Sequence, residues 1–530
     1  MLALTMPKSR TIGGLLDEMA ARHPDLEAIV DGPRRYTFTE VAAESRKVAK
    51  GLLALGVGRG DKVAVLMANR AEWLFAHFGA ALLGAAAVGV NTWSTARELA
   101  YVLAHSQAKA LITTDRYLKY DYLDLLEQLQ PWPERLPDLR HIIVVHGPPA
   151  TGMAAYDSFL ERGRSIDDAT LALASAHAHP DDVALLLYTS GSTSRPKGVL
   201  IQHAGLIENM WHIGERMHIQ PGDRLWMAVS LFWGFGCENA LYTMYTHGGC
   251  LVMQEAFEPA EALRLLATER CTVFYGLPNM VHALRTHPDF PTYDLSRLRT
   301  GITMGTPEQI TELSETFLPE VTLSYGMTEL YGNCSVCDSR TPIERRCAPG
   351  GPPLPGVEFK VVEPGTDRRL PAGEMGELRV RGYVTLGYHN DPELTAASFD
   401  SEGFFITGDL AVLDAEGWVA FRGRIKELVK TGGINVSPVE VEEVLLQHPM
   451  VSEAYVIGLP DPVRGEELAA VVLPKAGADE GLSAALLAYA RANLATYKVP
   501  RRFAVVQFEQ IPRTTTGKVQ KNRLADLFAE

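Results

Sequence analysis

The stretch Tyr188-Thr-Ser-Gly-Ser-Thr-Ser-Arg-Pro-Lys197-Gly198 concentrates hydroxyl groups, two glycines and one lysine in a short loop that follows an apolar run. Glycine permits backbone conformations that other residues avoid, and free N–H groups together with Ser and Thr hydroxyls can bind anionic oxygens. The spacing differs from a Walker A loop, so a P-loop fold is not implied. By composition alone, a Ser/Gly-rich surface turn is favoured over a phosphate site. The candidate phosphate-binding residues are Thr189, Ser190, Gly191, Ser192, Thr193 and Lys197.

The pattern around this loop predicts an α/β fold. Short β-rich runs alternate with helical stretches between about residues 182 and 329, which is typical of a mostly parallel sheet covered by helices. Ligands bind beyond the carboxyl ends of strands in such sheets, and both the loop from Thr189 and the segment Tyr325-Gly-Met-Thr-Glu329 begin there. The predicted strands are 183–187, 225–229, 251–253, 272–275 and 321–324, and the predicted helices are 259–268, 278–285 and 307–317.

The remaining sequence predicts further subdomains on either side of this region. The first part, to about residue 146, repeats the α/β texture, with strands at 62–66 and 110–113. Residues 349–423 are rich in Gly and Pro and predict a small β-rich subdomain with a hairpin turn at Glu416-Gly417. A compact pattern of strands and helices follows. We therefore predict an N-terminal domain over 1–425, made of two α/β subdomains and the β-rich one, and a small mobile α+β domain over 426–530.

Composition excludes several classes of protein. The chain has 530 residues, 46% of them hydrophobic, and a net charge of -14, which argues against nucleic acid or an anionic membrane as a general partner. The longest apolar stretch, residues 78–90, is too short and too rich in glycine to span a bilayer, and predicts a buried helix that runs into a strand. Six cysteines in so long a chain predict no disulfide framework and a cytoplasmic setting. For Cys334 and Cys337, incidental thiols are favoured over a zinc or redox site.

Five segments, in order along the chain, carry a resemblance that covers nearly all of it. With them, the sequence is identified as a member of the adenylate-forming superfamily, which includes acyl-CoA synthetases, adenylation domains of nonribosomal peptide synthetases and beetle luciferases. The resemblance implies an acid:CoA ligase that uses ATP, Mg²⁺ and CoA. The segments are Tyr188 to Gly198, Tyr325-Gly-Met-Thr-Glu329, Thr407-Gly-Asp409, Gly423-Arg-Ile-Lys-Glu-Leu428 and Pro512-Arg-Thr-Thr-Thr-Gly-Lys518.

The resemblance implies roles in the first half-reaction, which yields an acyl-adenylate and pyrophosphate. Lys518 is expected to reach between the acyl carboxylate and the α-phosphate, where the two anions need a positive charge. Glu329, beside the hydroxyl of Thr328, is expected to bind Mg²⁺, which takes one or two carboxylates together with phosphates and water. By composition alone, Lys518 would be a solvated lysine.

The adenosine part of ATP is assigned to a second group of residues. The resemblance implies that Tyr325 stacks on adenine and that Asp409 accepts hydrogen bonds from the ribose hydroxyls, with Arg424 near the ribose or the phosphates. From the sequence itself, Asp409 is as plausible as a turn residue after Gly408. The backbone positions expected to line the nucleotide are Gly305, Thr306, Pro307, Gly326 and Met327.

The resemblance also implies a movement between half-reactions. The small domain is expected to rotate about Lys426, which withdraws Lys518 and brings the segment Lys430-Thr-Gly-Gly433 to the acyl-adenylate. Gly432 and Gly433 would let pantetheine pass close to the backbone. The thiol then attacks a mixed anhydride with a good leaving group, so no general base is nominated.

The acyl pocket is where the sequence departs from common family patterns. Trp233 occupies the place where relatives carry an aromatic residue or a histidine beside the carboxylate. Met304 either projects into the pocket, which favours short or medium, branched or aromatic acids, or packs in the core. Other candidate lining residues are Tyr275, Gly276, Gly301, Tyr331 and Asn333.

The sequence leaves three alternatives open. A stand-alone adenylating enzyme that loads the phosphopantetheine of a separate carrier protein fits the same motifs. A luciferase-like oxygenase is disfavoured, as is a silent nucleotide-binding regulator, which would have no need of Lys518, Glu329, Asp409 and Arg424 together. Neither the acid nor the oligomeric state follows from the sequence, and a homodimer is among the options.

Overall fold

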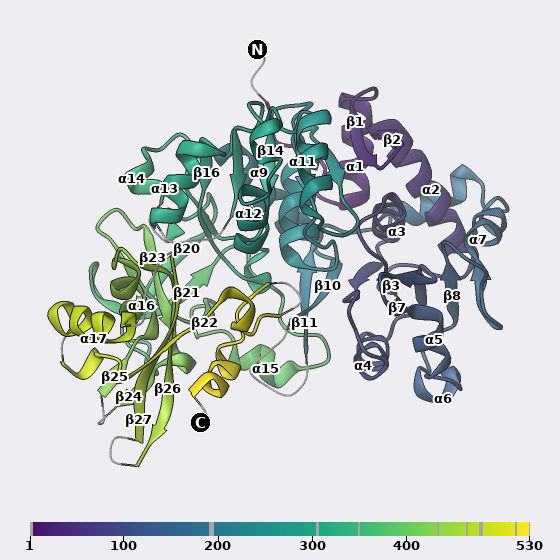
Figure 1. Cartoon of the computed structure of the whole chain (residues 1–530). Helices are drawn as coiled ribbons and strands as arrows, with labels where there is room; N and C mark the ends of the chain where they lie inside the picture. The colour runs from purple at the N-terminus through teal and green to yellow at the C-terminus, as the bar shows by residue number, and fades with distance from the viewer. Residues whose placement is uncertain are drawn as a thin grey trace. The chain divides into compact units, whose positions relative to one another are not determined.

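The computed structural model describes residues 4–189, 196–303, 307–347, 350–431, 434–462, 465–475, 481–494, 496–514 and 517–528. Packing of the Cα trace divides the chain into two compact units, one of residues 1–358 with 381–405 and one of residues 359–380 with 406–530 (Figure 1). The predicted α/β fold class is confirmed for the first unit, with an α+β arrangement in the second. The domain boundary at Lys426 lies inside the second unit and stays a prediction.

One sheet of the first unit has seven described strands in the order β16-β15-β14-β12-β13-β1-β2. The ladders from β16 to β1 are parallel, and β2 pairs antiparallel with β1. The strands are β1 (Glu27–Asp31), β2 (Arg34–Thr37), β12 (Arg224–Met227), β13 (Cys250–Met253), β14 (Val273–Tyr275), β15 (Thr300–Ile302) and β16 (Glu320–Thr322).

The other sheet also has seven described strands, in the order β11-β10-β4-β3-β5-β8-β9. All its ladders are parallel except that between β10 and β11. The strands are β3 (Lys62–Leu66), β4 (Ala86–Gly89), β5 (Ala110–Thr113), β8 (His141–Val144), β9 (Ala154–Ala155), β10 (Val183–Thr189) and β11 (Lys197–Gln202).

Two hairpins are exchanged between these sheets. The β1–β2 hairpin from the start of the chain joins β13 of the later sheet, whereas β10–β11 joins β4 of the earlier one. The sequence alternation had grouped the strand that became β10 with those that follow it. Which strands share a sheet is decided by long-range packing, and a local pattern of apolar residues carries no information on it.

Helices cover both sheets, and their ends show why they begin where they do. Thr37 and Thr95 each form a capping box at the start of α2 and α4, and Pro259 and Pro278 occupy the first turns of α11 and α12. In the part of the chain that the structure describes, none of the helices has the length and apolar character needed to cross a membrane. The helices of the first unit are α1 (Ile12–Arg22), α2 (Phe38–Ala54), α3 (Ala71–Leu82), α4 (Ala96–Ser106), α5 (Tyr122–Glu127), α6 (Trp132–Arg135), α7 (Tyr156–Gly163), α8 (Asp168–Ser175), α9 (His203–Arg216), the π-helix η1 (Phe235–Ala240), α10 (Leu241–Tyr245), α11 (Pro259–Thr268), α12 (Pro278–Arg285), the 3-10 helices η2 (Phe290–Thr292) and η3 (Thr328–Leu330), α13 (Pro307–Thr316), α14 (Ile343–Arg346) and α15 (Pro392–Ala397).

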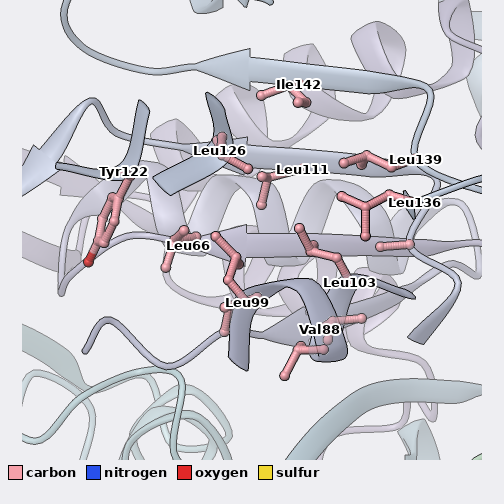
Figure 2. Packing of buried hydrophobic residues seen from close by; sticks show 14 of the residues in the cluster. Leu66, Val88, Leu99, Leu103, Leu111, Tyr122, Leu126, Leu136, Leu139 and Ile142 are labelled. Atoms are coloured by element: carbon pink, nitrogen blue, oxygen red, sulfur yellow. The ribbon is translucent and has the colours of Figure 1, made fainter. Parts of the chain in front are cut away.

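The core between the earlier sheet and its helices is built from branched aliphatic side chains. Leu66 and Leu111 from the strands face Leu99 and Leu103 of α4, as Figure 2 shows. The hydroxyl of Tyr122, at the edge of this core, donates to the Thr92 carbonyl at 2.8 Å. Burial of these apolar surfaces, at about 25 cal/mol per Å², holds the strand ends in fixed positions.

Two sheets make up most of the second unit. In one, β23, β22, β21 and β20 lie side by side, and the predicted turn at Glu416-Gly417 joins β22 to β23, with Gly417 at φ +80°. In the other, α16 and α17 pack on one face through an apolar cluster that includes Val441, Leu445 and Leu486. The elements are β20 (Glu358–Val362), β21 (Met375–Arg381), β22 (Phe405–Leu413), β23 (Val419–Arg424), η4 (Ile425–Glu427), β24 (Val429–Thr431), β25 (Ile434–Val436), α16 (Pro438–Leu446), β26 (Val451–Asp461), β27 (Gly465–Pro474), α17 (Leu482–Asn493), η5 (Thr496–Lys498), β28 (Arg502–Val505), η6 (Phe508–Gln510) and η7 (Lys521–Phe528).

Candidate active site

The carboxyl ends of strands from both sheets of the first unit meet, and a buried asparagine joins them. Asn69 follows β3, and its amide nitrogen donates to the carbonyl of Val229, just after β12, at 2.9 Å. Its amide oxygen accepts from the N–H of Leu231 at 2.9 Å. The loop that carries Trp233 is therefore fixed to the end of the other sheet, which is the place where open α/β sheets bind ligands.

The base of the hydroxyl-rich loop is a hairpin. Thr189 and Lys197 are paired across β10 and β11, so the two ends of the loop are held together. Of the candidate phosphate-binding residues, Ser190, Gly191, Ser192 and Thr193 lie outside the described residues.

The segment from Tyr325 to Glu329 forms a tight turn after the short strand β17 (Ser324–Tyr325), which pairs with β18 (Ser335–Val336). Gly326 is required there, because a Cβ at this position would lie 2.1 Å from the carbonyl oxygen of Gly332. The turn closes through the N–H of Gly332, which donates to the Met327 carbonyl at 3.2 Å. Thr328 and Glu329 then open the 3-10 helix η3 with partly exposed side chains, while Tyr325 is 7% exposed.

A segment that the sequence analysis missed ties this turn to the hairpin. The N–H of Thr385 donates to the carbonyl of Glu329 at 2.7 Å, and the N–H of His389 donates to that of Gly198 at 2.8 Å. Between them, the hydroxyl of Tyr388 donates to Oε1 of Glu329 at 2.9 Å. The ammonium group of Lys197 lies 5.3 Å from the centroid of the Tyr388 ring. Tyr388 thus links the predicted phosphate lysine to the predicted magnesium ligand.

An aromatic cluster follows β12. The ring of Phe235 stacks on that of Tyr275, at the end of β14, with 5.2 Å between centroids and 16° between planes. Trp233 contacts the same Phe235 edge to face at 6.0 Å. The hydroxyl of Tyr275 donates to Oδ1 of Asn239 at 2.9 Å, which fixes the π-helix η1 to the sheet. Trp233 and Tyr275 are therefore brought into one cluster.

The other predicted pocket residues have different surroundings. Tyr331, at φ +52°, packs its ring on Gly205, and its hydroxyl accepts from the N–H of Gln202 at 3.1 Å. Gly276 and Gly301 both lie against Phe274, where the strands approach closely. Asn333 is 7% exposed, and its carbonyl accepts from Asn209 at 2.8 Å. Pro307 begins α13, while Met304, Gly305 and Thr306 lie outside the described residues.

A buried carboxyl group lies beside this site. Glu238 of η1 has no exposed surface, and neither of its oxygens has a hydrogen-bond partner among the described residues. Burial, and then the charge of Glu329, raise the pKa of Glu238 well above its ordinary value, which favours the uncharged acid. The sequence signal was a lone glutamate inside an apolar run.

In the second unit, the structure brings Asp409 and Arg424 together. They are direct partners across β22 and β23, and Nε of Arg424 lies 3.2 Å from Oδ1 of Asp409. Gly408 lies inside β22 with φ +69°, directly before Asp409, and the Asp409 N–H donates to the hydroxyl of Thr407 at 3.0 Å. Asp409 is 3% exposed, so its carboxylate is held in one position.

Lys518 lies at the end of a small hairpin. The N–H of Thr514 donates to the Lys518 carbonyl at 2.7 Å, and Gly517 takes φ +80° in the turn. The side chain of Lys518 is exposed, yet the surrounding protein, and then the guanidinium of Arg424, lower the pKa of its ammonium group. Its electrostatic neighbours also include Asp409, so three predicted residues of this unit form one group.

The predicted hinge and CoA-binding residues lie close together in the sequence of the second unit. Lys426 is the central residue of the 3-10 helix η4. Lys430 is on β24, and its N–H donates to Glu466 at 2.7 Å. Gly432 and Gly433 lie outside the described residues.

The cysteines of the chain are all buried with free thiols, Cys334 and Cys337 among them. Within the described ranges, no group of three or more His, Cys, Asp and Glu side chains is arranged to hold a metal ion. Burial raises the pKa of Cys337, which favours the unreactive thiol form.

Comparison with known proteins agrees with this arrangement. Residues 16–389 match the AMP-binding enzyme family, and residues 440–518 match the AMP-binding enzyme C-terminal domain. YngI of Bacillus subtilis (strain 168), which bears the name of an acyl-CoA synthetase, is 37% identical over 98% of this chain and 97% of its own. ACSF2 of Danio rerio, named a mitochondrial medium-chain acyl-CoA ligase, is 33% identical over 98% of this chain and 88% of its own.

Solved structures give the same result. The anthranilate CoA ligase AuaEII, crystallised with anthranoyl-AMP, has a TM-score of 0.85 and 28% identity, with 98% of each chain covered. The two family segments together cover most of the sequence. The alignments with YngI and with AuaEII each cover 98% of it. The chain therefore belongs to the AMP-binding, adenylate-forming enzyme family, among its acyl-CoA ligases.

Proposed function

We propose that the protein is an ATP-dependent, AMP-forming acid:CoA ligase for a compact carboxylic acid, either short or medium in chain length, branched or aromatic. The observation that carries the proposal is the series of contacts from Lys197 through Tyr388 to Glu329. It joins a cation suited to phosphates with a carboxylate suited to a metal ion, at the end of an α/β sheet.

In the first half-reaction, a carboxylate oxygen of the acid attacks the α-phosphorus of ATP, and the bond to the bridging oxygen of the β-phosphate breaks to release pyrophosphate. Lys518 supplies positive charge to the carboxylate and the α-phosphate as they approach. Burial, and then the nearby guanidinium of Arg424, lower the pKa of this ammonium group, and the negative charges of the carboxylate and the phosphate would offset both effects.

The residues of the first unit fit a magnesium ion. Glu329 offers a carboxylate beside the hydroxyl of Thr328, and hard oxygen ligands of this kind suit Mg²⁺ bound chiefly by phosphates. When bound, the ion would neutralise charge on the leaving pyrophosphate. The hydrogen bond from the Tyr388 hydroxyl to Oε1 fixes the orientation of the Glu329 carboxylate.

The adenosine is assigned to Tyr325, Asp409 and Arg424. The ion pair between Asp409 and Arg424 supports this, because it orients a carboxylate that can accept from two ribose hydroxyls. Tyr325 would supply the aromatic face for adenine.

In the second half-reaction, the CoA thiolate attacks the acyl carbon, and AMP leaves with the electrons of the broken C–O bond. We place the hinge for this step at Lys426 and the CoA contacts at Lys430 and the following glycines. The position of Lys426 in the short helix η4 supports the hinge, because such connections absorb changes of φ and ψ.

The aromatic cluster supports the choice of a compact acid. Trp233, Phe235 and Tyr275 place three rings close together, where flat or branched groups can pack. The names of two similar proteins, for anthranilate and for medium-chain acids, fall in the same range.

The test is AMP release with ATP, Mg²⁺ and a panel of carboxylic acids, with and without CoA, followed by mass spectrometry for acyl-CoA. Turnover that requires CoA and gives a thioester supports the ligase. Exchange of pyrophosphate without turnover by CoA would instead indicate the alternative, an adenylating enzyme whose acceptor is a carrier protein. Absence of any acid-dependent exchange would overturn both.

A further inference from the structure

A buried asparagine of the earlier sheet holds the loop that leads to Trp233. Val229 lies two residues beyond the end of β12, where the strand ladder no longer pairs the backbone. The Asn69 amide donates to the Val229 carbonyl and accepts from the Leu231 N–H, both at 2.9 Å, and it also lies 3.4 Å from the Gln254 carbonyl. Because Asn69 is 2% exposed, loss of its amide would leave buried backbone groups unpaired.

The neighbouring strand of the same sheet contacts the next part of this loop. Gly89 is the last residue of β4, and a Cβ there would lie 2.9 Å from the carbonyl oxygen of Phe232 and 3.1 Å from its Cα. The ring of Trp93, a few residues further along, packs edge to face on the Phe232 ring with 5.4 Å between centroids. The loop of residues 229–233 is therefore held by three residues of a sheet to which it does not belong.

The loop passes its position on to Trp233. The Trp233 N–H donates to the Ser230 carbonyl at 3.2 Å, and a Cβ at Gly236 would lie 2.3 Å from the oxygen of that carbonyl. The turn is thus tight, so a displacement of the loop moves Trp233 with it. Trp233 is partly exposed, and a Cβ at the next residue, Gly234, would lie 3.5 Å from the hydroxyl oxygen of Thr328. The turn therefore borders the candidate active site.

We propose that Asn69 and Gly89 are positioning residues that determine how sharply the enzyme discriminates between acids, because they fix the loop that carries Trp233. The inference rests on the proposed function, which places Trp233 beside the acyl group. A displacement of about 1 Å in a group that orients a substrate can cost about 10²-fold in rate. The ATP contacts are assigned to other segments, those of Lys197 and Glu329 among them, so ATP binding should not change.

The experiment measures kcat/KM in the CoA-dependent assay for two series of acids, butyrate to octanoate and benzoate to 4-butylbenzoate. Discrimination is the ratio of kcat/KM between the most and the least favoured acid of a series that the enzyme accepts. Asn69→Ala is expected to lower this ratio by about 10-fold or more, with the KM for ATP within about twofold of the wild-type value. A variant that is merely less stable loses active enzyme equally for every acid, which leaves the ratio unchanged.

A second variant tests the loop through an independent contact. Gly89→Ala forces the Phe232 backbone to shift, so it should lower the ratio in the same way, and it serves if Asn69→Ala does not fold. The control is Thr113→Val, at the end of the adjacent strand β5. The buried Thr113 hydroxyl donates to the Leu66 carbonyl at 2.9 Å, so this variant removes a hydrogen bond at the same edge of the sheet without touching the loop. It should leave the ratio unchanged.

A double-mutant cycle tests whether the effect passes through Trp233. In a Trp233→Leu background, Asn69→Ala should change the ratio by less than about twofold, because no indole ring is left to position. An equal effect in both backgrounds, or an unchanged ratio in both Asn69→Ala and Gly89→Ala, overturns the inference and leaves the ligase intact. So does a wild-type enzyme that accepts acids but prefers none within either series. No turnover of any acid, in these series or in the wider panel, would be the failure of the proposed function.

Discussion

At the scale of single residues, Tyr388 contacts both Lys197 and Glu329, which lie in segments far apart in the sequence. Tyr388→Phe removes the hydroxyl group that donates to Glu329 and leaves the ring beside Lys197. Loss of an outer partner of a metal-binding carboxylate typically costs 10–100-fold in metal affinity or activity. We expect the Mg²⁺ concentration for half-maximal adenylation to rise by about 10-fold, measured by pyrophosphate release across a magnesium titration.

A matched control lies a few residues away. The hydroxyl of Tyr383 donates to Glu208 at 3.2 Å, so Tyr383→Phe also breaks a tyrosine–glutamate hydrogen bond, outside the site. Its magnesium dependence should equal that of the wild type. Equal shifts in both variants would mean that Tyr388 acts on the fold and not on Glu329.

Lys518 carries a second prediction at this scale. Lys518→Ala should reduce acid-dependent pyrophosphate release by about 10²-fold or more, because a charge aimed at the transition state is lost. Formation of the thioester from supplied acyl-adenylate should be largely spared. The two half-reactions are measured separately, with Lys475→Ala, an exposed lysine of the same unit, as the control. Equal loss in both half-reactions would contradict this division of labour.

Some residues of the candidate site could be predicted from the sequence, and others could not. Lys518, Asp409 and Glu329 stand in motifs whose residue types follow from the chemistry, so their neighbourhoods could be anticipated. Tyr388 and Asn69 could not be found, since each acts through one contact with a segment far away along the chain. Glu238 was visible as an isolated acid in an apolar run, but only the structure shows that its carboxyl group is fully buried without a hydrogen-bond partner among the described residues.

At the scale of elements, an ion-pair cluster fastens the β1–β2 hairpin to α3. Arg34 of β2 bridges Asp31 of β1 and Glu72 of α3, and Arg70 lies 2.9 Å from Glu72. Burial raises the pKa of Glu72, but the hydrogen bond from Arg34 and the charge of Arg70 outweigh it and lower this pKa to about 2. Glu72 therefore stabilises the folded state in its ionised form.

The prediction concerns the pH dependence of stability. A lowered pKa contributes stability that is present above the unfolded value of 4.5 and is lost as the pH falls toward 2. Glu72→Gln should lower the free energy of unfolding by about 3 kcal/mol at pH 7, and this difference should narrow between pH 4.5 and pH 2. Urea unfolding followed by tryptophan fluorescence at pH 7, 4.5 and 3.5 measures it.

A surface pair provides the comparison. Glu44 contacts Lys47 at 2.6 Å with both side chains partly exposed, so Glu44→Gln should change the free energy of unfolding by less than about 1 kcal/mol. A pH-independent difference for Glu72→Gln would show that its cost is steric.

Elements themselves were largely predictable. The predicted helices at 259–268 and 278–285 agree with α11 and α12 residue for residue, because proline in the first turn marks where each begins. The predicted strand at 321–324 is instead divided into β16 and β17, which pair with different partners. Such a break depends on tertiary contacts and leaves no trace in a short apolar run.

At the scale of the whole molecule, the proposed rotation is needed for the second half-reaction and not for the first. A substitution that stiffens the backbone at the hinge should therefore impair only the second. Lys426→Pro fixes φ near -65° at the proposed hinge and should lower acyl-CoA formation by about 10-fold or more, while pyrophosphate release is largely kept. Rapid-quench measurement of both products gives the ratio.

The control introduces a proline at a turn position whose backbone conformation already favours proline. Ala415 is the second residue of the turn that the Gly417 N–H closes on the Asp414 carbonyl at 3.0 Å, a position that favours proline. Ala415→Pro should leave both half-reactions unchanged. If Lys426→Pro behaves in the same way, the hinge is not at this residue.

The exchange of hairpins between the two sheets has a consequence for the newborn chain. During synthesis, β1 and β2 leave the ribosome long before their partner β13, and β4 leaves it long before its partner β10. Neither sheet can therefore be completed until these later strands have been made. Until then, each nascent half presents an open strand edge, the feature by which chains aggregate. Fragments cut between the halves should be insoluble alone and recover a fold only when they are produced together.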